Sequence, residues 1–225
     1  MHFHLTDPPP DTCWALVAVK RRAECKGRLA GRLAAEARLS LVRLMLERVL
    51  TALRAARTID RIVVVSPERD TVPSDIPVLE DSGHGLNAVL DTARQTLVDR
   101  GMGELVVLPA DLPMITAADI DALVESGRRT GFALATDIEG MSTNGLYLAA
   151  PAAFRFHFGP GSRLRHFKEA MRLGLKPELV RAPGLEFDLD MAEDLSRLRV
   201  RVDPTYALLP LAADGGPCLT QTRCG

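Results

Sequence analysis

Short apolar runs alternate along the chain with longer stretches of helical period. The most strongly apolar runs lie at residues 14–19, 62–66 and 105–110, and each is bounded by polar or turn-forming residues. Both faces of these runs are apolar, which is typical of strands inside a sheet that is covered on both sides. The pattern therefore predicts three buried strands.

Helices are predicted between and after these strands. Apolar residues recur at spacings of three and four from Leu39 to Leu53, and a second such stretch runs from Leu86 to Leu97. This period indicates helices that pack one face on a core. Thr116 and Asp119 have the spacing of a capping box, which predicts the start of a third helix.

The alternation of strands and helices predicts an α/β fold, a three-layer sandwich around a mixed, mostly parallel sheet. Residues 132–136 and 145–150 are apolar and follow each other without a long helix between them, so we expect an antiparallel pair there. We predict a single domain over residues 14–200, preceded by an extension (1–13) and followed by a tail (201–225), because the periodicity ends near Val200.

Composition and charge exclude several classes of protein. The 28 basic and 29 acidic residues give a net charge of -1, so no overall field attracts nucleic acid or an anionic membrane. No apolar run reaches the roughly 18 residues of a membrane span, and the N-terminus does not have the layout of a signal peptide. We therefore expect a cytoplasmic protein. The four cysteines lack metal-site spacing, so we expect free thiols.

Three acidic residues lie at the end of a predicted strand or within an extended segment. Asp111 comes directly after the run 105–110, and the carboxyl ends of strands border the ligand crevice of an open α/β sheet. Asp188 and Asp190 are two residues apart, so they share one face of an extended segment. Such carboxylates suit Mg²⁺. In the alternative interpretation, Asp111 caps a turn and Asp190 caps a helix.

A basic loop follows the first predicted strand. Lys20, Lys26 and Arg28 are placed where cations would meet a polyanion such as a triphosphate. One such ion pair at about 4 Å is worth on the order of 4 kcal/mol before desolvation. A solvated charge run is the alternative. The sequence contains neither a P-loop motif nor a dinucleotide-binding fingerprint.

Two further segments have the character of small-anion sites. Residues 158–166 put glycines and Ser162 at a predicted helix start, where backbone N–H groups favour a phosphate or carboxylate. Ser162 as an ordinary N-cap is the alternative. Thr143 and Asn144 lie immediately before a predicted strand, and alone they indicate only a turn.

Together these segments resemble one family, the CofC/FbiD-type guanylyltransferases of coenzyme F(420) biosynthesis. The resemblance spans about residues 14–198 and is carried by motifs in the order W-A-L-V-A-V-K, K-G-R-L-A, D-S-G-H-G-L-N-A, L-P-A-D-L-P, S-T-N-G-L, F-G-P-G-S with His166, and D-L-D-M-A-E-D-L. It implies the nucleotide-diphospho-sugar transferase-like (nucleotidyltransferase) fold.

The resemblance also implies a role for each candidate residue. It implies that Mg²⁺ is held by Asp111, Asp188 and Asp190. It implies that the GTP phosphates are neutralised by Lys20, Lys26 and Arg28. The catalytic set comprises the two lysines and the three acids. The guanosine pocket would be lined by Gly85, Leu86 and Asn87. The acceptor would be bound by Thr143, Gly159 and Ser162.

The reaction implied is attack of an acceptor phosphate on the α-phosphorus of GTP, with release of pyrophosphate. Family members use 2-phospho-L-lactate, phosphoenolpyruvate or 3-phospho-D-glycerate. The arginine-rich composition suggests a high-GC bacterial genome, which favours the last two. The chain departs from the family at Ala18, usually proline, and at Ser142, usually glycine, and the latter leaves acceptor identity open.

Other classes and partners remain open at this stage. A molybdenum-cofactor-type nucleotidyltransferase usually has a glycine-rich loop where this chain has A-V-K-R-R. A non-catalytic GTP-binding module would not need the full set of three acids and three cations. An aspartyl phosphohydrolase normally opens with its D-x-D motif, whereas here the motif lies near the end. We expect a transient contact with the downstream deazaflavin-accepting transferase, and the apolar segment 208–211 is a candidate dimer contact.

Overall fold

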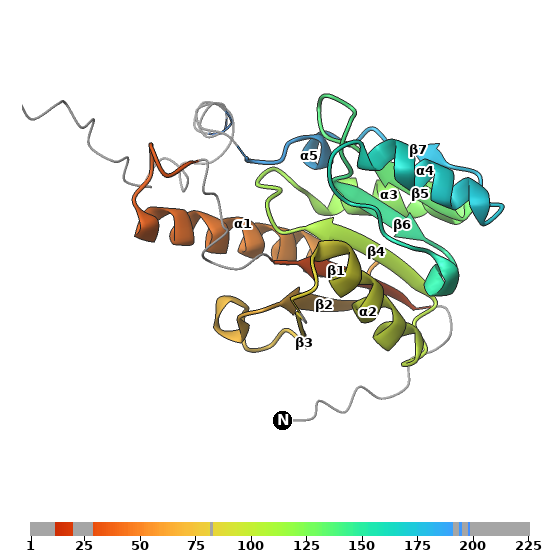
Figure 1. The fold of residues 1–225 in the computed structure, drawn as a ribbon, viewed down its shortest axis with the longest axis horizontal. Coiled ribbons are helices and arrows are strands. Elements are labelled where there is room, and N and C mark those ends of the chain that lie inside the picture. Colours follow the sequence, from red (N-terminus) through yellow and green to blue (C-terminus); the bar gives the residue numbers. More distant parts are fainter. Residues whose placement is uncertain (1–11, 20–28, 82, 191–193, 195–197, 199–225) are drawn as a thin grey trace, which may run out of the picture.

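The computed structural model describes residues 12–19, 29–81, 83–190, 194 and 198. Its strands are β1 (Cys13–Ala18), β2 (Arg61–Ser66), β3 (Val78–Glu80), β4 (Glu104–Pro109), β5 (Phe132–Ala135), β6 (Gly145–Leu148) and β7 (Glu178–Leu179). Its α-helices are α1 (Ala35–Ala55), α2 (Leu86–Val98), α3 (Ala117–Thr130), α4 (Ser162–Arg172) and α5 (Pro183–Glu186), and short 3₁₀ turns lie at η3 (Arg69–Thr71) and η4 (Pro151–Ala153). Figure 1 shows their arrangement around the sheet.

The strands form one seven-stranded sheet in the order β3-β2-β1-β4-β6-β5-β7. Strand β6 is antiparallel to both of its neighbours, while the other pairings are parallel. The predicted mixed, mostly parallel sheet is therefore confirmed. The predicted antiparallel pair is also confirmed, since Phe132 pairs with Leu148 and Ala135 with Gly145.

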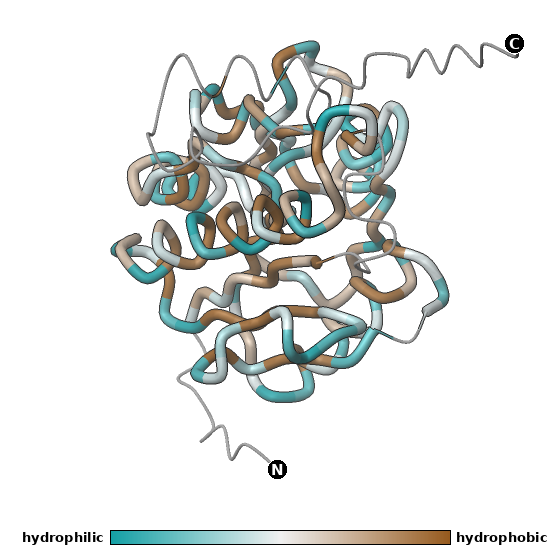
Figure 2. The backbone as a smooth tube through the Cα atoms, turned by 90° about the vertical axis from the view of Figure 1, so that its left-hand side faces the viewer, coloured by the Kyte–Doolittle hydropathy of each residue, from teal (hydrophilic) through white to brown (hydrophobic). Residues whose placement is uncertain are grey.

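Helices cover both faces of the sheet, which gives the three predicted layers (Figure 1). On β1, Ala15 and Val17 belong to the apolar cluster that contains side chains of α1 and α3. Trp14 and Leu16 belong to the opposite cluster, with side chains of α2 and α4. All four are fully buried, which explains why the strand is apolar on both faces. In Figure 2 the apolar stretches of the tube run through the inside of the molecule.

A third apolar cluster joins the beginning of α1 to the end of the described chain. Leu41 and Met45 of α1 pack with Leu189, which is fully buried. This contact fixes the segment that carries Asp188 and Asp190 beside α1.

Most helices begin where the sequence predicts. Helix α3 has a complete capping box, in which the Thr116 hydroxyl accepts the Asp119 N–H and the Asp119 carboxylate accepts the Thr116 N–H. Strands β3 and β7 were not predicted, because strands of three and two residues are too short to show a period. No helix among the described residues is long and apolar enough to cross a membrane.

Candidate active site

The three predicted metal-binding acids lie at the carboxyl end of β4. The Leu189 N–H donates to the Asp111 carbonyl at 3.2 Å, so residues 188–190 cross the loop that follows β4. Leu189 is buried against α1, whereas Asp188 and Asp190 are partly exposed. This alternation confirms that the two aspartates lie on the same face of an extended segment.

The electrostatics of Asp188 show that the three acids act on one another. Its pKa is raised to about 6, first by burial and then by the negative charge of Asp111, with a smaller contribution from Asp190. Within the described part of the chain, however, no three acidic, histidine or cysteine side chains are gathered closely enough to form a ready metal site. Hard oxygen donors whose charges repel one another nevertheless fit a hard cation, because the cation would offset the repulsion.

Asn144 joins these acids to the predicted acceptor site. Its side-chain nitrogen donates to Asp188 Oδ1 at 3.2 Å, and its backbone N–H donates to the Ala135 carbonyl at 2.9 Å. Asn144 is buried and directly precedes β6. Its role was missed from the sequence, where the pair Thr143-Asn144 indicated only a turn.

Thr143 faces a buried histidine. Its Oγ1 lies 2.9 Å from His166 Nδ1, and the His157 backbone N–H donates to the other ring nitrogen, Nε2, at 2.9 Å. His166 is fully buried, and burial, more than the nearby cationic groups, lowers its pKa to about 3. The ring is therefore neutral at physiological pH. The sequence placed His166 in a motif but gave it no role.

The beginning of α4 supplies the other two predicted acceptor-binding residues. Gly161 is the N-cap, and Ser162 is the first helical residue, so the interpretation of Ser162 as an N-cap is wrong. The Ser162 N–H donates to the Gly159 carbonyl at 3.0 Å, and Gly159 has a φ of 113°, a conformation that favours glycine. Ser162 and His166 are four residues apart on one helix face, which brings Ser162 and Thr143 to the same region.

The loop before Thr143 is held by Asp137. The carboxylate of Asp137 accepts the N–H groups of Met141 at 2.7 Å and Ser142 at 3.1 Å. The Met141 carbonyl in turn accepts the Arg163 N–H of α4 at 3.3 Å. Ser142, the residue that departs from the family pattern, is thus fixed through its backbone beside the predicted acceptor site.

Residues predicted to line the guanosine pocket lie at the start of α2. Gly85 is the N-cap with a φ of 87°, and Leu86 is exposed. The Asn87 amide makes two hydrogen bonds with the backbone of Phe158: Oδ1 accepts the N–H at 2.6 Å and Nδ2 donates to the carbonyl at 3.1 Å. Asn87 therefore links the predicted nucleotide loop to the predicted acceptor loop.

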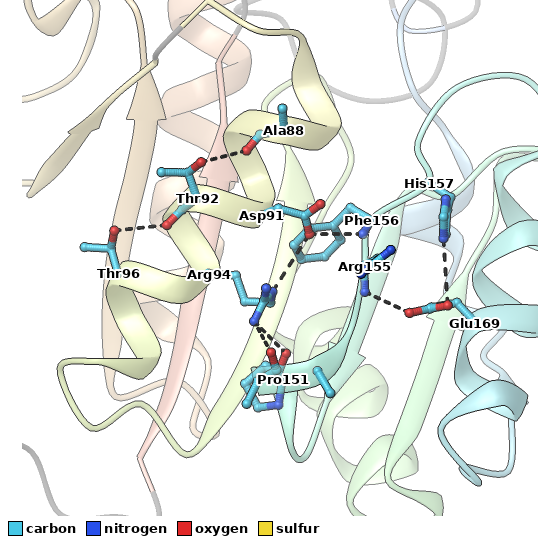
Figure 3. A network of polar contacts seen from close by, with 12 residues as sticks. Ala88, Asp91, Thr92, Arg94, Thr96, Pro151, Arg155, Phe156, His157 and Glu169 are labelled. Atoms are coloured by element: carbon cyan, nitrogen blue, oxygen red, sulfur yellow. Dashed lines mark hydrogen bonds and ion pairs between the residues drawn. The ribbon is translucent and has the colours of Figure 1, made fainter.

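Two more residues on the same face of α2 extend this link, as Figure 3 shows. Asp91 accepts the Phe156 N–H at 3.3 Å, and Arg94 donates to the carbonyls of Pro151 and Ala152. Burial raises the pKa of Asp91. The hydrogen bonds of Asn87, Asp91 and Arg94 thus tie α2 to the chain between η4 and α4.

The predicted phosphate-binding residues Lys20, Lys26 and Arg28 lie outside the described residues.

Solved structures show which class of protein has this fold. A putative nucleotide-diphospho-sugar transferase from Desulfovibrio desulfuricans superposes with a TM-score of 0.72 at 18% identity, covering 88% of this chain and 93% of that one. A 4-diphosphocytidyl-2C-methyl-D-erythritol synthase superposes with a TM-score of 0.55 at 15% identity, covering 86% and 100%. The mixed sheet and the helices on its two faces are those of a nucleotidyltransferase-type α/β sandwich.

Sequence similarity identifies the family within this class. Residues 13–209 match the family described as "Guanylyl transferase CofC like". A phosphoenolpyruvate guanylyltransferase from Sphaerobacter thermophilus is 41% identical over 192 residues, 83% of this chain and 92% of that protein. A 2-phospho-L-lactate guanylyltransferase from Methanothermobacter thermautotrophicus is 31% identical over 201 residues, 87% of each chain. The chain belongs to the CofC-like guanylyl transferase family and is an enzyme of the nucleotidyltransferase class, which sets aside the molybdenum-cofactor alternative.

Proposed function

We propose that this enzyme transfers GMP from GTP to the phosphate of a three-carbon phospho-acid, with release of pyrophosphate, as a step of coenzyme F(420) biosynthesis. One observation carries the proposal beyond family membership. The hydrogen bond between Asn144 and Asp188 joins the acids to Thr143, the first predicted acceptor-binding residue. The acceptor would thus be bound beside the group of acids that can hold a metal.

The residues divide between the two substrates. Lys20, Lys26 and Arg28 neutralise the GTP phosphates, and the loop with Gly85 and Leu86 lines the guanosine pocket. Asn87 acts there chiefly by fixing the loop to Phe158, because its amide already bonds that backbone. Thr143, Gly159 and Ser162 bind the acceptor.

Asp111, Asp188 and Asp190 are the residues that would hold Mg²⁺. The metal, when bound, supplies positive charge to the phosphates between which the bond breaks. The acceptor phosphate is already ionised at neutral pH and attacks the α-phosphorus in line, so no side chain has to take a proton from it. The protein's part is to hold the two phosphates in line and to surround them with fixed charges and N–H donors.

Phosphoenolpyruvate is the acceptor we favour, and 3-phospho-D-glycerate comes next. Relatives named phosphoenolpyruvate guanylyltransferase reach 41% identity, whereas the 2-phospho-L-lactate guanylyltransferase is 31% identical. The three possible acceptors share a carboxylate and a phosphate, so the choice among them depends on the contacts with the carbon skeleton.

The test is release of pyrophosphate from GTP, in the presence of Mg²⁺, with each of the three candidate acceptors in turn. The assay includes the deazaflavin-accepting transferase that we propose takes the product. Release with one acceptor and not the others would support the reaction and name the acceptor. GTP binding without release under any acid would favour the non-catalytic GTP-binding module. A homodimer is a further part of the proposal, and sizing of the purified protein would test it.

A further inference from the structure

The hydrogen bonds of His166 determine which of its ring nitrogens carries the proton. A backbone N–H can only donate, so the bond from His157 requires a lone pair on Nε2. A neutral imidazole carries one proton, which must then be on Nδ1. The burial of the ring, which lowers the pKa of His166 to about 3, agrees with a neutral side chain.

This tautomer determines the role of the Thr143 hydroxyl. Since Nδ1 carries the proton, it donates to Thr143 Oγ1 across the 2.9 Å contact. A hydroxyl has one proton and two lone pairs, so Thr143 keeps its proton for another partner. Thr143 lies beside Asn144, which contacts Asp188, and one helical turn separates His166 from Ser162. The partner is therefore expected among the groups of a bound acceptor.

We propose that His166 is a positioning residue, which fixes Thr143 as a hydrogen-bond donor to an anionic oxygen of the acceptor, and this rests on the proposed function. Hydrogen bonds to a charged oxygen are about twice as strong as those between neutral groups. A hydroxyl held as a donor therefore selects an ionised carboxylate or phosphate oxygen over a neutral N–H or O–H group at this position.

The surroundings of the ring dictate the choice of variants. The His166 ring packs edge-on against Phe158 with ring centroids 4.8 Å apart, so its removal would also disturb packing. His166→Phe keeps an aromatic ring and removes both nitrogens. His166→Asn is smaller and keeps an N–H donor near the position of Nδ1. Thr143→Val keeps the shape of the side chain without the hydroxyl, and Thr143→Ser keeps the hydroxyl.

A double-mutant cycle separates positioning from a general structural role. We expect Thr143→Val to raise the KM for the acceptor about 10- to 50-fold, the value of one charge-assisted hydrogen bond. His166→Phe should raise it about tenfold in the wild-type background and less than twofold in the Thr143→Val background. Thr143→Ser and His166→Asn should recover most of the loss, and the KM for GTP should stay within twofold. Independent effects of the two sites, or equal rises in both KM values, would overturn the proposal.

The tautomer can be measured without any turnover. Nitrogen-15 spectra of the imidazole groups should show His166 protonated on Nδ1 only, and protonation on Nε2 or on both nitrogens would overturn the proposal. His157→Ala is the matched control, because it removes a half-exposed ring and leaves the backbone N–H in place. It should change neither the spectrum of His166 nor the acceptor KM by more than twofold.

The proposed function and this inference fail in different ways. Suppose that the wild type binds phosphoenolpyruvate in the presence of a non-hydrolysable GTP analogue, but transfers no GMP when GTP itself is supplied. The proposed function then fails. The same cycle, measured as Kd by calorimetry, then supports the role of His166 if the effects are coupled and overturns it if they are independent. Absence of acceptor binding would overturn both.

Discussion

The side-chain nitrogen of Asn144 donates to Asp188 Oδ1 at 3.2 Å, across 44 residues of sequence. This bond lowers the pKa of Asp188, while burial and Asp111 raise it. The bond joins the predicted metal-binding acids to the predicted acceptor-binding residues before β6. It therefore makes these two halves of the candidate site depend on each other.

Replacement of Asn144 should therefore affect both halves. We expect Asn144→Ala to lower kcat at least tenfold and to reduce the free energy of unfolding by about 1–2 kcal/mol, because it removes a partly buried hydrogen bond to a carboxylate. Steady-state kinetics and urea unfolding would measure the two effects. Ser142→Gly, next but one in the sequence, is the control and should retain most of the activity. Wild-type kcat in Asn144→Ala would contradict the assigned role.

The raised pKa of Asp188 predicts a pH-dependent stability of the metal-free enzyme. The folded protein binds a proton at Asp188 up to about pH 6, whereas the unfolded chain releases it near pH 4. Stability should therefore fall as the pH rises from about 4 to about 6, by at most about 3 kcal/mol. Asp188→Asn should abolish this contribution and be the more stable protein at pH 7. Unfolding curves at pH 4 and pH 7 measure this difference. An equal change in the free energy of unfolding between the two pH values in both proteins would contradict the prediction.

The same substitution should abolish both turnover and metal-dependent stabilisation. Mg²⁺ at ten times its Kd would stabilise the wild type by about 1.4 kcal/mol, which is roughly 4 °C in Tm for a chain of this size. Asp188→Asn should show no such rise, and chelation of the metal should return the wild type to its lower Tm. Melting curves with and without Mg²⁺ check this, and an equal rise in Asp188→Asn would exclude Asp188 as a ligand.

The pair of hydrogen bonds between Asn87 on α2 and the Phe158 backbone makes a fourth prediction. Asn87→Ala removes both hydrogen bonds to the Phe158 backbone, so the loop that carries Gly159 should lose its fixed position. We expect the KM for the acceptor to rise about tenfold or more and the Tm to fall by a few degrees. Gln95→Ala removes an exposed contact on the same helix and should change neither value. An effect of Asn87→Ala confined to the KM for GTP would show instead that its amide contacts the nucleotide.

A substitution remote from the site tests the packing of α3 on the sheet. A Cβ atom added at Gly127 would overlap the ring of Tyr147 on β6, whereas a Cβ at Gly31 would meet nothing within 4 Å. Gly127→Ala should lower the free energy of unfolding by about 2 kcal/mol or more, and Gly31→Ala should be close to neutral. Chemical unfolding of the two variants measures the difference. A neutral Gly127→Ala would mean that α3 can shift away from β6 at little cost.

Local patterns in the sequence determined the layers of the fold and some of the site. The apolar runs of β1, β2 and β4 specify buried strands because both of their faces are covered. The Thr116–Asp119 capping box and the alternation around Leu189 are likewise complete within a few residues. Each of these features depends on neighbours in the chain, so the sequence alone was sufficient.

Only the tertiary structure decided how the site is assembled. Asn144 meets Asp188 across 44 residues, Asn87 meets Phe158 across 71, and Thr143 meets His166 across 23. The short strands β3 and β7 also depend on partners that are distant in the chain. A residue's own sequence neighbourhood contains no record of such a partner, because hydrogen bonds of this kind form only after the sheet has brought the segments together. The sequence therefore determined the candidate residues, and the fold determined which of them position one another.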